Sequence, residues 1–307
     1  MNKLVGPKTV IDCYSFIDAL STYGFADYAQ GRYYNDPNVL YDEAHANEAE
    51  YLLNETKCVS GSKILEIGCG NGRILETAKR RGADATGITI ATGQFESNNA
   101  RGLKTLLMNY KDIPQEWNGQ FDAVIANGSM EHSVQLDDAV ADKGDQIYAE
   151  EFSIMHRILK PGARLVTTVL HFRQYVDPQE IKKGIKAFKR GSPNFHWALL
   201  ADTMGGWYPK DRQLIKCAKP YFRNIRREDG TEDYRHTSEE WLKIWNRILI
   251  TDPRSWFIIA KYFIKDPINT FRLIDNFGIS QSWAFQFRSQ NGQNAPCILF
   301  RDTWEKM

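Results

Sequence analysis

The chain has 307 residues, of which 42% are hydrophobic and 25% charged, and its formal net charge is +1. This composition is typical of a folded globular protein and excludes a long disordered chain. We see no signal-peptide layout and no apolar stretch of about 20 residues, because Lys261 and Lys265 interrupt the most apolar late segment. We therefore expect a cytoplasmic protein.

The charge is unevenly distributed along the chain. Residues 181–272 hold 19 Lys and Arg against 10 Asp and Glu, and five of the eight tryptophans. Such a segment suits an anionic metabolite, a phospholipid surface or nucleic acid, and equally a solvated basic face over an aromatic core. The five cysteines form no C-x-x-C pair and the histidines have no metal-ligand spacing, so we predict neither a disulfide framework nor a metal site.

The predicted elements change character at Gly61. Residues 1–60 predict helices, whereas the following segments alternate between short apolar runs and amphipathic stretches. We predict strands at 63–68, 83–90, 104–109, 121–128 and 163–172, with helices at 72–82, 92–102 and 145–162. This alternation is typical of parallel βαβ units in a doubly wound α/β sheet.

After His171 the alternation stops for about a hundred residues of helical and irregular sequence. Two further strands, at 282–289 and 296–304, are then predicted on either side of a glycine-containing turn, as a terminal hairpin. The sequence therefore predicts a seven-stranded α/β sheet with a helical insertion between its fifth strand and its last two.

The segment "EIGCGNG", residues 66–72, forms the first strand-to-helix turn, where open α/β sheets bind ligands. Gly68, Gly70 and Gly72 lack Cβ atoms, so a ligand can approach the backbone closely. The spacing is G-x-G-x-G, since position 73 is arginine, and it differs from the dinucleotide fingerprint G-x-G-x-x-G. There is also no G-K-[ST] of a P-loop.

A strand, G-x-G-x-G and a helix together resemble the S-adenosylmethionine (SAM) site of Rossmann-like class I methyltransferases. "GITIATGQ", residues 87–94, is similar to the G-x-T-[LI]-[SA]-x-x-Q of the cyclopropane-fatty-acid-synthase-like branch. This resemblance implies SAM as cofactor and S-adenosylhomocysteine as product. It assigns the cofactor contacts to Glu66, Gly68, Gly70, Thr89, Ile90, Gln94, Asn109, Tyr110 and Asn127.

Three further segments resemble that branch: "NGSMEH", "TVLHF" and "DYRHTSEEW". The resemblance implies that Glu131, His171 and Tyr234 are catalytic, and we expect Glu131 or the adjacent His132 to act on the acceptor. In cyclopropane synthases the equivalent Glu, His and Tyr hold a bicarbonate base together with a cysteine of an S-C-A-Y-F motif. No such motif occurs in residues 20–60, so the bicarbonate site would lack one ligand.

The resemblance also implies a division of the chain. Residues 1–60 would cover the cofactor site, residues 61–172 and 276–307 would form the SAM-binding class I methyltransferase sheet with its terminal β-hairpin, and residues 173–275 would form a helical lid. We expect a methyltransferase acting on a C, N, S or O atom of a small-molecule metabolite. A cyclopropane-type lipid-modifying enzyme is the alternative, and a non-catalytic SAM-binding or RNA-associated module is a third interpretation.

The expected partners follow from this assignment. They are a small-molecule acceptor, which the basic lid allows to be anionic, and no DNA. Membrane contact is expected only as peripheral contact, and a homodimer is left open because aromatic-rich helices could supply its surface.

Overall fold

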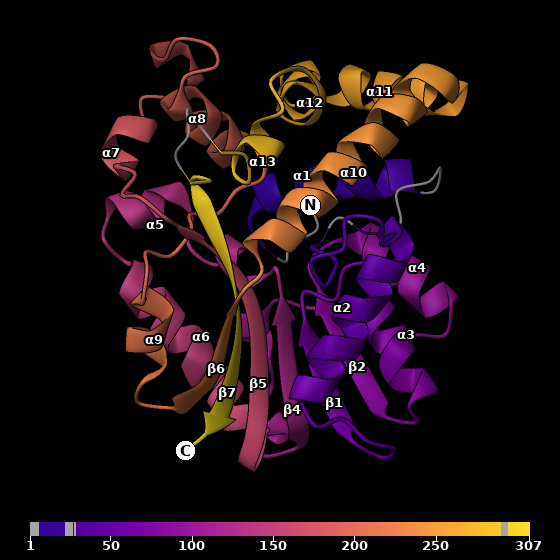
Figure 1. Ribbon diagram of the computed structural model, residues 1–307, viewed down its shortest axis with the longest axis vertical. Coiled ribbons are helices and arrows are strands. Elements are labelled where there is room, and N and C mark those ends of the chain that lie inside the picture. The colour runs from indigo at the N-terminus through magenta and orange to yellow at the C-terminus, as the bar shows by residue number, and fades with distance from the viewer. Residues whose placement is uncertain (1–5, 22–26, 28, 290–293) are drawn as a thin grey trace.

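In the computed structural model, which describes residues 6–21, 27, 29–289 and 294–307, one sheet of seven strands organises the chain (Figure 1). The strand order is β3-β2-β1-β4-β5-β7-β6, and β7 runs antiparallel to its neighbours β5 and β6. The chain moves outward from β1 to β3 and then returns to β4. The order therefore reverses between β1 and β4, and their carboxyl ends flank the crevice that such sheets use for ligands. The strands are β1 Lys63–Ile67, β2 Asp84–Thr89, β3 Thr105–Leu107, β4 Phe121–Asn127, β5 Leu159–Phe172, β6 Phe222–Asp229 and β7 Cys297–Lys306.

Helices cover both faces of the sheet and gather over one end of it. In Figure 1, α2, α3 and α4 lie on one side, α5, α6 and α9 lie on the other, and α1, α8 and α10 to α13 lie over the end opposite the C-terminus. The helices are α1 Lys8–Ser21, α2 Tyr41–Glu55, α3 Arg73–Arg80, α4 Thr92–Ala100, α5 Leu136–Val140, α6 Gly144–Ile158, α7 Pro178–Ile181, α8 Pro193–Thr203, α9 Gln213–Ala218, α10 Thr231–Thr251, α11 Pro253–Lys265, α12 Pro267–Ile274 and α13 Ser282–Phe285. Short 3₁₀ turns at Met130–His132 and elsewhere, and a π-helical turn at Asp275–Ile279, join them.

The seven-stranded α/β fold is confirmed, but the position of the sixth strand differs from the prediction. The predicted strand at 282–289 begins with helix α13, and the sixth strand is β6, which lies inside the segment expected to be a helical lid. β6 pairs only with β7, so it is an edge strand, and its arginines and acidic residues are those of a strand half exposed to water. The many charged residues of β6 do not match the apolar pattern of a strand, so the sequence does not predict it. Helix α13, in contrast, contains buried aromatic residues such as Trp283, which are also common in strands.

The cap over the sheet contributes a group of aromatic side chains to the main hydrophobic core. Trp241 and Trp245 of α10 stack with ring centroids 5.4 Å apart, and Trp283 packs 4.8 Å from Trp241. The ring centroid of Phe277 lies 5.1 Å from that of Trp241 and 5.7 Å from that of Trp245. Aromatic contacts of this kind add stabilisation beyond the area that they bury. The tryptophans at 241 and 245 therefore belong to the packing of the cap.

A buried arginine joins the cap to the sheet. The side chain of Arg301 on β7 is fully buried, forms a salt bridge with Glu48 of α2 at 2.9 Å and donates to Asp233 of α10 at 2.8 Å. It also donates to the carbonyl oxygen of Gly31 at 3.1 Å. One guanidinium thus connects elements that are far apart in the sequence.

We predict that Arg301→Ala lowers the free energy of unfolding by about 3 to 5 kcal/mol, because it leaves the buried carboxylate of Glu48 and the partly buried carboxylate of Asp233 without their cation. Arg226→Ala is the matched control, since Arg226 is half exposed and pairs with Glu55 at the surface; it should cost less than about 1 kcal/mol. Chemical denaturation measures both. Equal losses in the two variants would contradict the role given to Arg301.

Candidate functional site

A pocket enclosing about 1510 Å³, counted out to its open mouth, lies at the carboxyl ends of β1, β2 and β4 beneath the helical cap. All nine predicted cofactor positions line it: Glu66, Gly68, Gly70, Thr89, Ile90, Gln94, Asn109, Tyr110 and Asn127. Of the predicted catalytic residues, Glu131 and Tyr234 line it as well. The predicted residues at the carboxyl ends of β1, β2 and β4 therefore line a single cavity.

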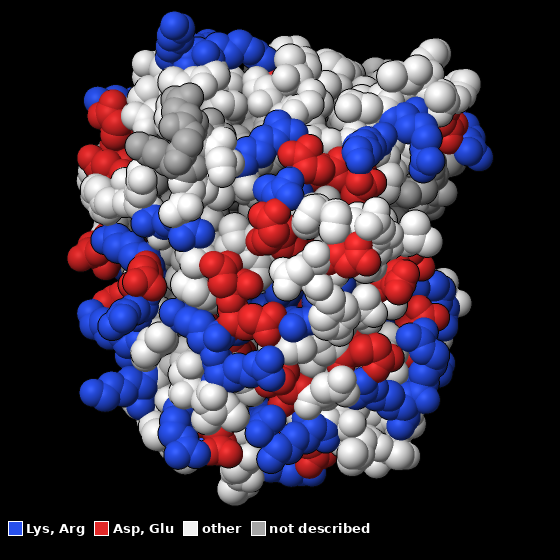
Figure 2. Space-filling view, viewed as in Figure 1, with Lys and Arg blue, Asp and Glu red and all other residues white. Residues whose placement is uncertain are grey.

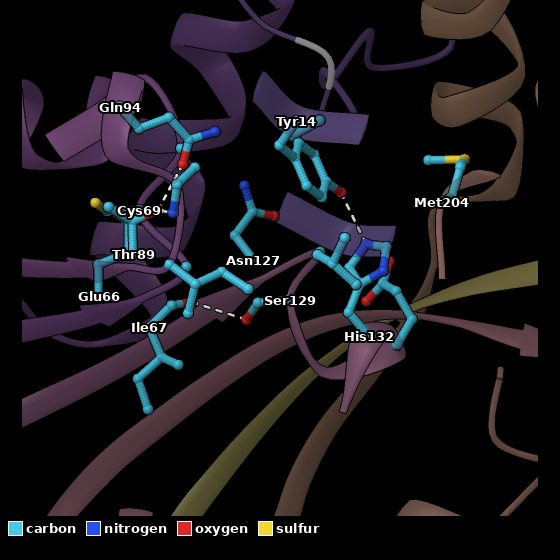
Figure 3. Close-up of a pocket in the computed structure, with 18 of the residues that line it drawn as sticks. Tyr14, Glu66, Ile67, Cys69, Thr89, Gln94, Asn127, Ser129, His132 and Met204 are labelled. Atoms are coloured by element: carbon cyan, nitrogen blue, oxygen red, sulfur yellow. Dashed lines mark hydrogen bonds between the residues drawn. The ribbon is translucent and has the colours of Figure 1, made fainter. Parts of the chain in front are cut away.

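The glycine turn forms the floor of the pocket. Gly68 and Gly70 have positive φ angles of 76° and 48°, which L side chains rarely adopt. A Cβ atom on Gly68 would lie 2.6 Å from the Cβ of Ser129, whose hydroxyl donates to the carbonyl oxygen of Ile67 at 2.8 Å (Figure 3). The loops after β1 and β4 are therefore in contact here, with the Ser129 side chain against the backbone of Gly68.

The ends of β2 and β4 carry neutral polar side chains. The Thr89 hydroxyl donates to Gln94 Oε1 at 2.6 Å, and the backbone amide of Ala91 donates to the Thr89 hydroxyl at 3.1 Å. On β4, Asn127 Oδ1 accepts a hydrogen bond from the Thr168 hydroxyl at 2.5 Å. Figure 3 shows Thr89 and Gln94 together on one side of the pocket, with Asn127 between them and His132.

Three buried carboxyl groups line the same pocket. Glu66, Glu131 and Glu151 are at most 4% exposed, and each has one oxygen without a hydrogen-bond partner within the described part of the chain. Burial raises the pKa of Glu66 well above its ordinary value and raises the pKa of Glu131 and of Glu151 to about 8. At neutral pH these carboxyl groups are therefore largely protonated unless a cation enters the pocket.

At the other end of the pocket, His132 forms a pair with Tyr14 of α1. The Tyr14 hydroxyl and His132 Nε2 are 2.7 Å apart, and His132 Nδ1 lies 3.2 Å from the carbonyl oxygen of Gly205 (Figure 3). A carbonyl oxygen can only accept, so Nδ1 carries the proton and Nε2 accepts from Tyr14. Burial lowers the pKa of His132 to about 4, so the ring is neutral at pH 7.

This end of the pocket is otherwise apolar and aromatic. Tyr234 is buried, and burial raises the pKa of its hydroxyl, which is hydrogen-bonded with Trp283. Val10 and Ile17 of α1 line the pocket on the same helix face as Tyr14. The remaining lining at this end comes from Leu170, Met204, Tyr208, Trp241, Phe277 and Trp283.

His171 does not lie where the sequence analysis expected it. Its neighbour Leu170 lines the pocket, and consecutive side chains of a strand point to opposite faces, so His171 lies behind the pocket wall. There the ring packs edge-on against Phe300 at 5.1 Å and its Nδ1 lies 3.0 Å from the carbonyl oxygen of Val169. Burial lowers its pKa to about 4. His171 is thus a neutral core histidine, whereas His132 lines the pocket.

The sequence analysis missed several residues of the site. Tyr14 and Glu151 belong to helices whose amphipathic pattern indicates only a buried face. Gly206 has a positive φ of 92°, and a Cβ atom there would lie 2.3 Å from the carbonyl oxygen of Glu131. The pair Gly205–Gly206 was the one available signal, because two adjacent glycines indicate a close approach of the backbone. Among the described residues, no group of three or more His, Cys, Asp or Glu side chains is arranged to hold a metal ion.

The raised pKa of Glu151 predicts a pH-dependent stability. A carboxyl whose folded pKa is about 8 stabilises the fold at low pH and loses this contribution as the pH rises from about 4.5 to 8. Glu151→Gln should therefore match the wild type at pH 5 and melt higher at pH 8. One pKa unit is worth about 1.4 kcal/mol, so we expect a difference of at least about 3 °C.

Thermal unfolding followed by circular dichroism at the two pH values tests this, with the exposed Glu116→Gln as the control. A melting difference between Glu151→Gln and the wild type that is the same at pH 5 and at pH 8 would refute the assignment.

Comparison with known proteins identifies the family. Residues 14–249 match the family described as mycolic acid cyclopropane synthetase. The ubiquinone biosynthesis O-methyltransferase of Pseudomonas aeruginosa (strain UCBPP-PA14) is 29% identical over 167 residues, which are 50% of this chain and 66% of that protein. The matches to curated relatives span 27% to 66% of the length of those proteins.

Two solved structures have the same fold. The cyclopropane synthase MmaA2 from Mycobacterium tuberculosis superposes with a TM-score of 0.72 at 17% identity, covering 99% of this chain and all of that one. The mycolic acid cyclopropane synthase CmaA1, solved with S-adenosylhomocysteine and CTAB, gives a TM-score of 0.74 at 16% identity with the same coverage. With the match over residues 14–249, these findings show that the chain belongs to the mycolic acid cyclopropane synthetase family of class I SAM-dependent methyltransferases.

Proposed function

We propose that the protein transfers the methyl group of SAM to an atom of a small-molecule acceptor. The observation that carries this proposal is that the glycine floor and the Tyr14–His132 pair line one continuous cavity. A cofactor lying on the floor and an acceptor lying against the pair would meet inside it, away from bulk water. Such positioning supplies several kcal/mol of a transfer barrier, on the order of 7 or more.

The residues on the cofactor side fit SAM. The unpartnered oxygen of Glu66 suits the ammonium group of the methionine portion, because a cation beside a buried carboxyl stabilises its ionised form. The bare backbone at Gly68 and Gly70 leaves room for the rest of that portion. By the family resemblance, Thr89 and Gln94 would contact the ribose, and Asn109 and Tyr110 the adenine. When bound, SAM supplies an electrophilic methyl group on a sulfonium.

On the acceptor side, the Tyr14–His132 pair can take the proton of an acceptor group that becomes strongly acidic as it is methylated, because burial lowers the pKa of His132 to about 4. An acceptor whose hydroxyl, amine or thiol donates to Tyr14 Oη can pass its proton to that oxygen while the Tyr14 proton moves to His132 Nε2. The carbonyl oxygen of Gly205 holds the ring in the orientation that this requires. Glu131, next in the chain, offers its free oxygen to the same region. An acceptor atom without a proton would need only alignment.

A cyclopropane-forming activity is the second candidate, because the matching family is named for it. The residues present do not fit its bicarbonate ion. Only Glu131 and Tyr234 of the four expected ligands line the pocket; His171 points away, and the S-C-A-Y-F cysteine is absent from the sequence. Glu131 and Tyr234 are both protonated at neutral pH and neither is a cation, so they offer no positive charge to hold a bicarbonate ion.

We predict that the purified protein transfers label from methyl-labelled SAM to a member of a panel of soluble phenols, amines and thiols. Gly70→Ala should abolish this transfer by placing a methyl group in the pocket floor. Gly119→Ala is the matched control, since Gly119 has a similar φ of 63° but nothing within 4 Å of its would-be Cβ. Label entering phospholipid instead would favour the lipid alternative, and salt-sensitive RNA binding without any transfer would favour the non-catalytic interpretation.

The proton-transfer role predicts a selective effect of Tyr14→Phe. Losing the hydroxyl while keeping the ring should lower kcat for a proton-bearing acceptor by about 10²- to 10⁴-fold and leave SAM affinity unchanged. Methylation of a tertiary amine or thioether should be unaffected. The exposed Tyr175→Phe serves as the control. Undiminished turnover of a phenol or primary amine by Tyr14→Phe would remove the pair from the mechanism.

A further inference from the structure

Large apolar side chains are exposed on one part of the cap and do not belong to the hydrophobic core. Six of them occur between residues 250 and 271 and are between 49% and 87% exposed. These six side chains lie on or next to helix α11, which contacts α10 and α12, and a group of exposed apolar side chains on adjoining helices marks an interaction site. We call this surface the α11 face; its apolar residues are Ile250, Trp256, Phe257, Ile264, Ile268 and Phe271.

Helix α11 packs against the protein with its other side. The Tyr262 hydroxyl donates to the carbonyl oxygen of Ser15 at 2.8 Å, and its ring contacts Phe16 of α1 at 5.2 Å. Ser255 is the single buried residue of the helix. Phe257 and Ile264, seven residues apart, lie on the same side of the helix and face outward, so their exposure comes from the fold and needs a reason other than core packing.

The chain segment that carries this face is basic, while Asp12 and Asp18 of α1 lie on the side where Tyr262 packs. Between residues 247 and 272 the sequence has five Lys and Arg and two acidic residues. The acidic ones, Asp252 and Asp266, cap the N-termini of α11 and α12, and Asp252 also pairs with Arg254. Lys261 Nζ lies 4.9 Å from the ring centroid of the exposed Phe257. In Figure 2, uncharged atoms and a band of Lys and Arg lie side by side at the edge where Figure 1 places α11.

We propose that the α11 face docks peripherally on a membrane surface that carries anionic lipid headgroups. Aromatic and aliphatic side chains that flank Lys and Arg on one exposed helix match an interfacial helix, whose apolar groups enter the lipid while its cations meet the headgroups. Contact between two copies through this face would bring like charges together. In the described ranges, no helix has the length and apolarity needed to cross a membrane, so the contact is a surface one.

Vesicle co-sedimentation tests this with the full-length protein. Wild type should bind vesicles of phosphatidylcholine and phosphatidylglycerol in equal parts, and bind pure phosphatidylcholine far more weakly. Phe257→Ser/Ile264→Ser should weaken binding by about tenfold or more. Val59→Ser/Tyr175→Ser is the matched control, because these two side chains are 65% and 69% exposed elsewhere on the surface, and it should bind like wild type.

A second readout separates insertion from simple attraction. Brominated lipid should quench the fluorescence of wild type more than that of Trp256→Phe, since Trp256 is the exposed tryptophan of this face. Thermal unfolding checks that every variant is folded. The proposal is overturned if Phe257→Ser/Ile264→Ser binds like wild type, or if added salt alone removes binding and no quenching occurs. It is equally overturned if sedimentation velocity shows a dimer that this variant converts to monomer, with no vesicle binding.

Discussion

Buried carboxyl groups without a partner are the constraint on which the site depends. Glu66 and Glu131 each keep one oxygen free of hydrogen bonds to the described residues, and both side chains are almost fully buried in the pocket wall. The protein tolerates them by keeping them protonated, as their raised pKa values indicate. A ligand with positive charge would change this balance, because it makes the ionised forms favourable. SAM would bring two such charges, an ammonium and a sulfonium.

Most of the sheet and the gathering of the nine positions around one pocket were predictable from the sequence, because their signals are local. The turn at 66–72, the strand end at Thr89 and the strand end at Asn127 each combine an apolar run with a polar or glycine residue directly after it. Parallel strands bring such ends to one edge of a sheet. Nine residues separated along the chain therefore line a single pocket, and the fold class follows from the same alternation.

The acceptor side could not be predicted as well, because its residues come together only through tertiary packing. His171 and Leu170 differ by one position in a strand, and the register of β5 against β7 decides which of them faces the pocket. Tyr14 reaches His132 across 118 residues of sequence. Edge strand β6 could not be predicted because its charged residues mask the strand pattern. Trp283 lies in helix α13, whose composition resembles that of a strand. The family resemblance identified the motif around Glu131, but only the three-dimensional structure shows that Tyr14 and His132 lie in the same pocket.

Calorimetric titration in buffers of different ionisation enthalpy tests the central claim, because it counts the protons exchanged on binding. If cationic SAM ionises the buried carboxyl groups, binding at pH 7 releases protons. The release should be larger for SAM than for S-adenosylhomocysteine, which lacks the sulfonium charge, and Glu66→Gln should reduce it for both. Binding without proton release, or a protein that binds neither compound, would contradict the account.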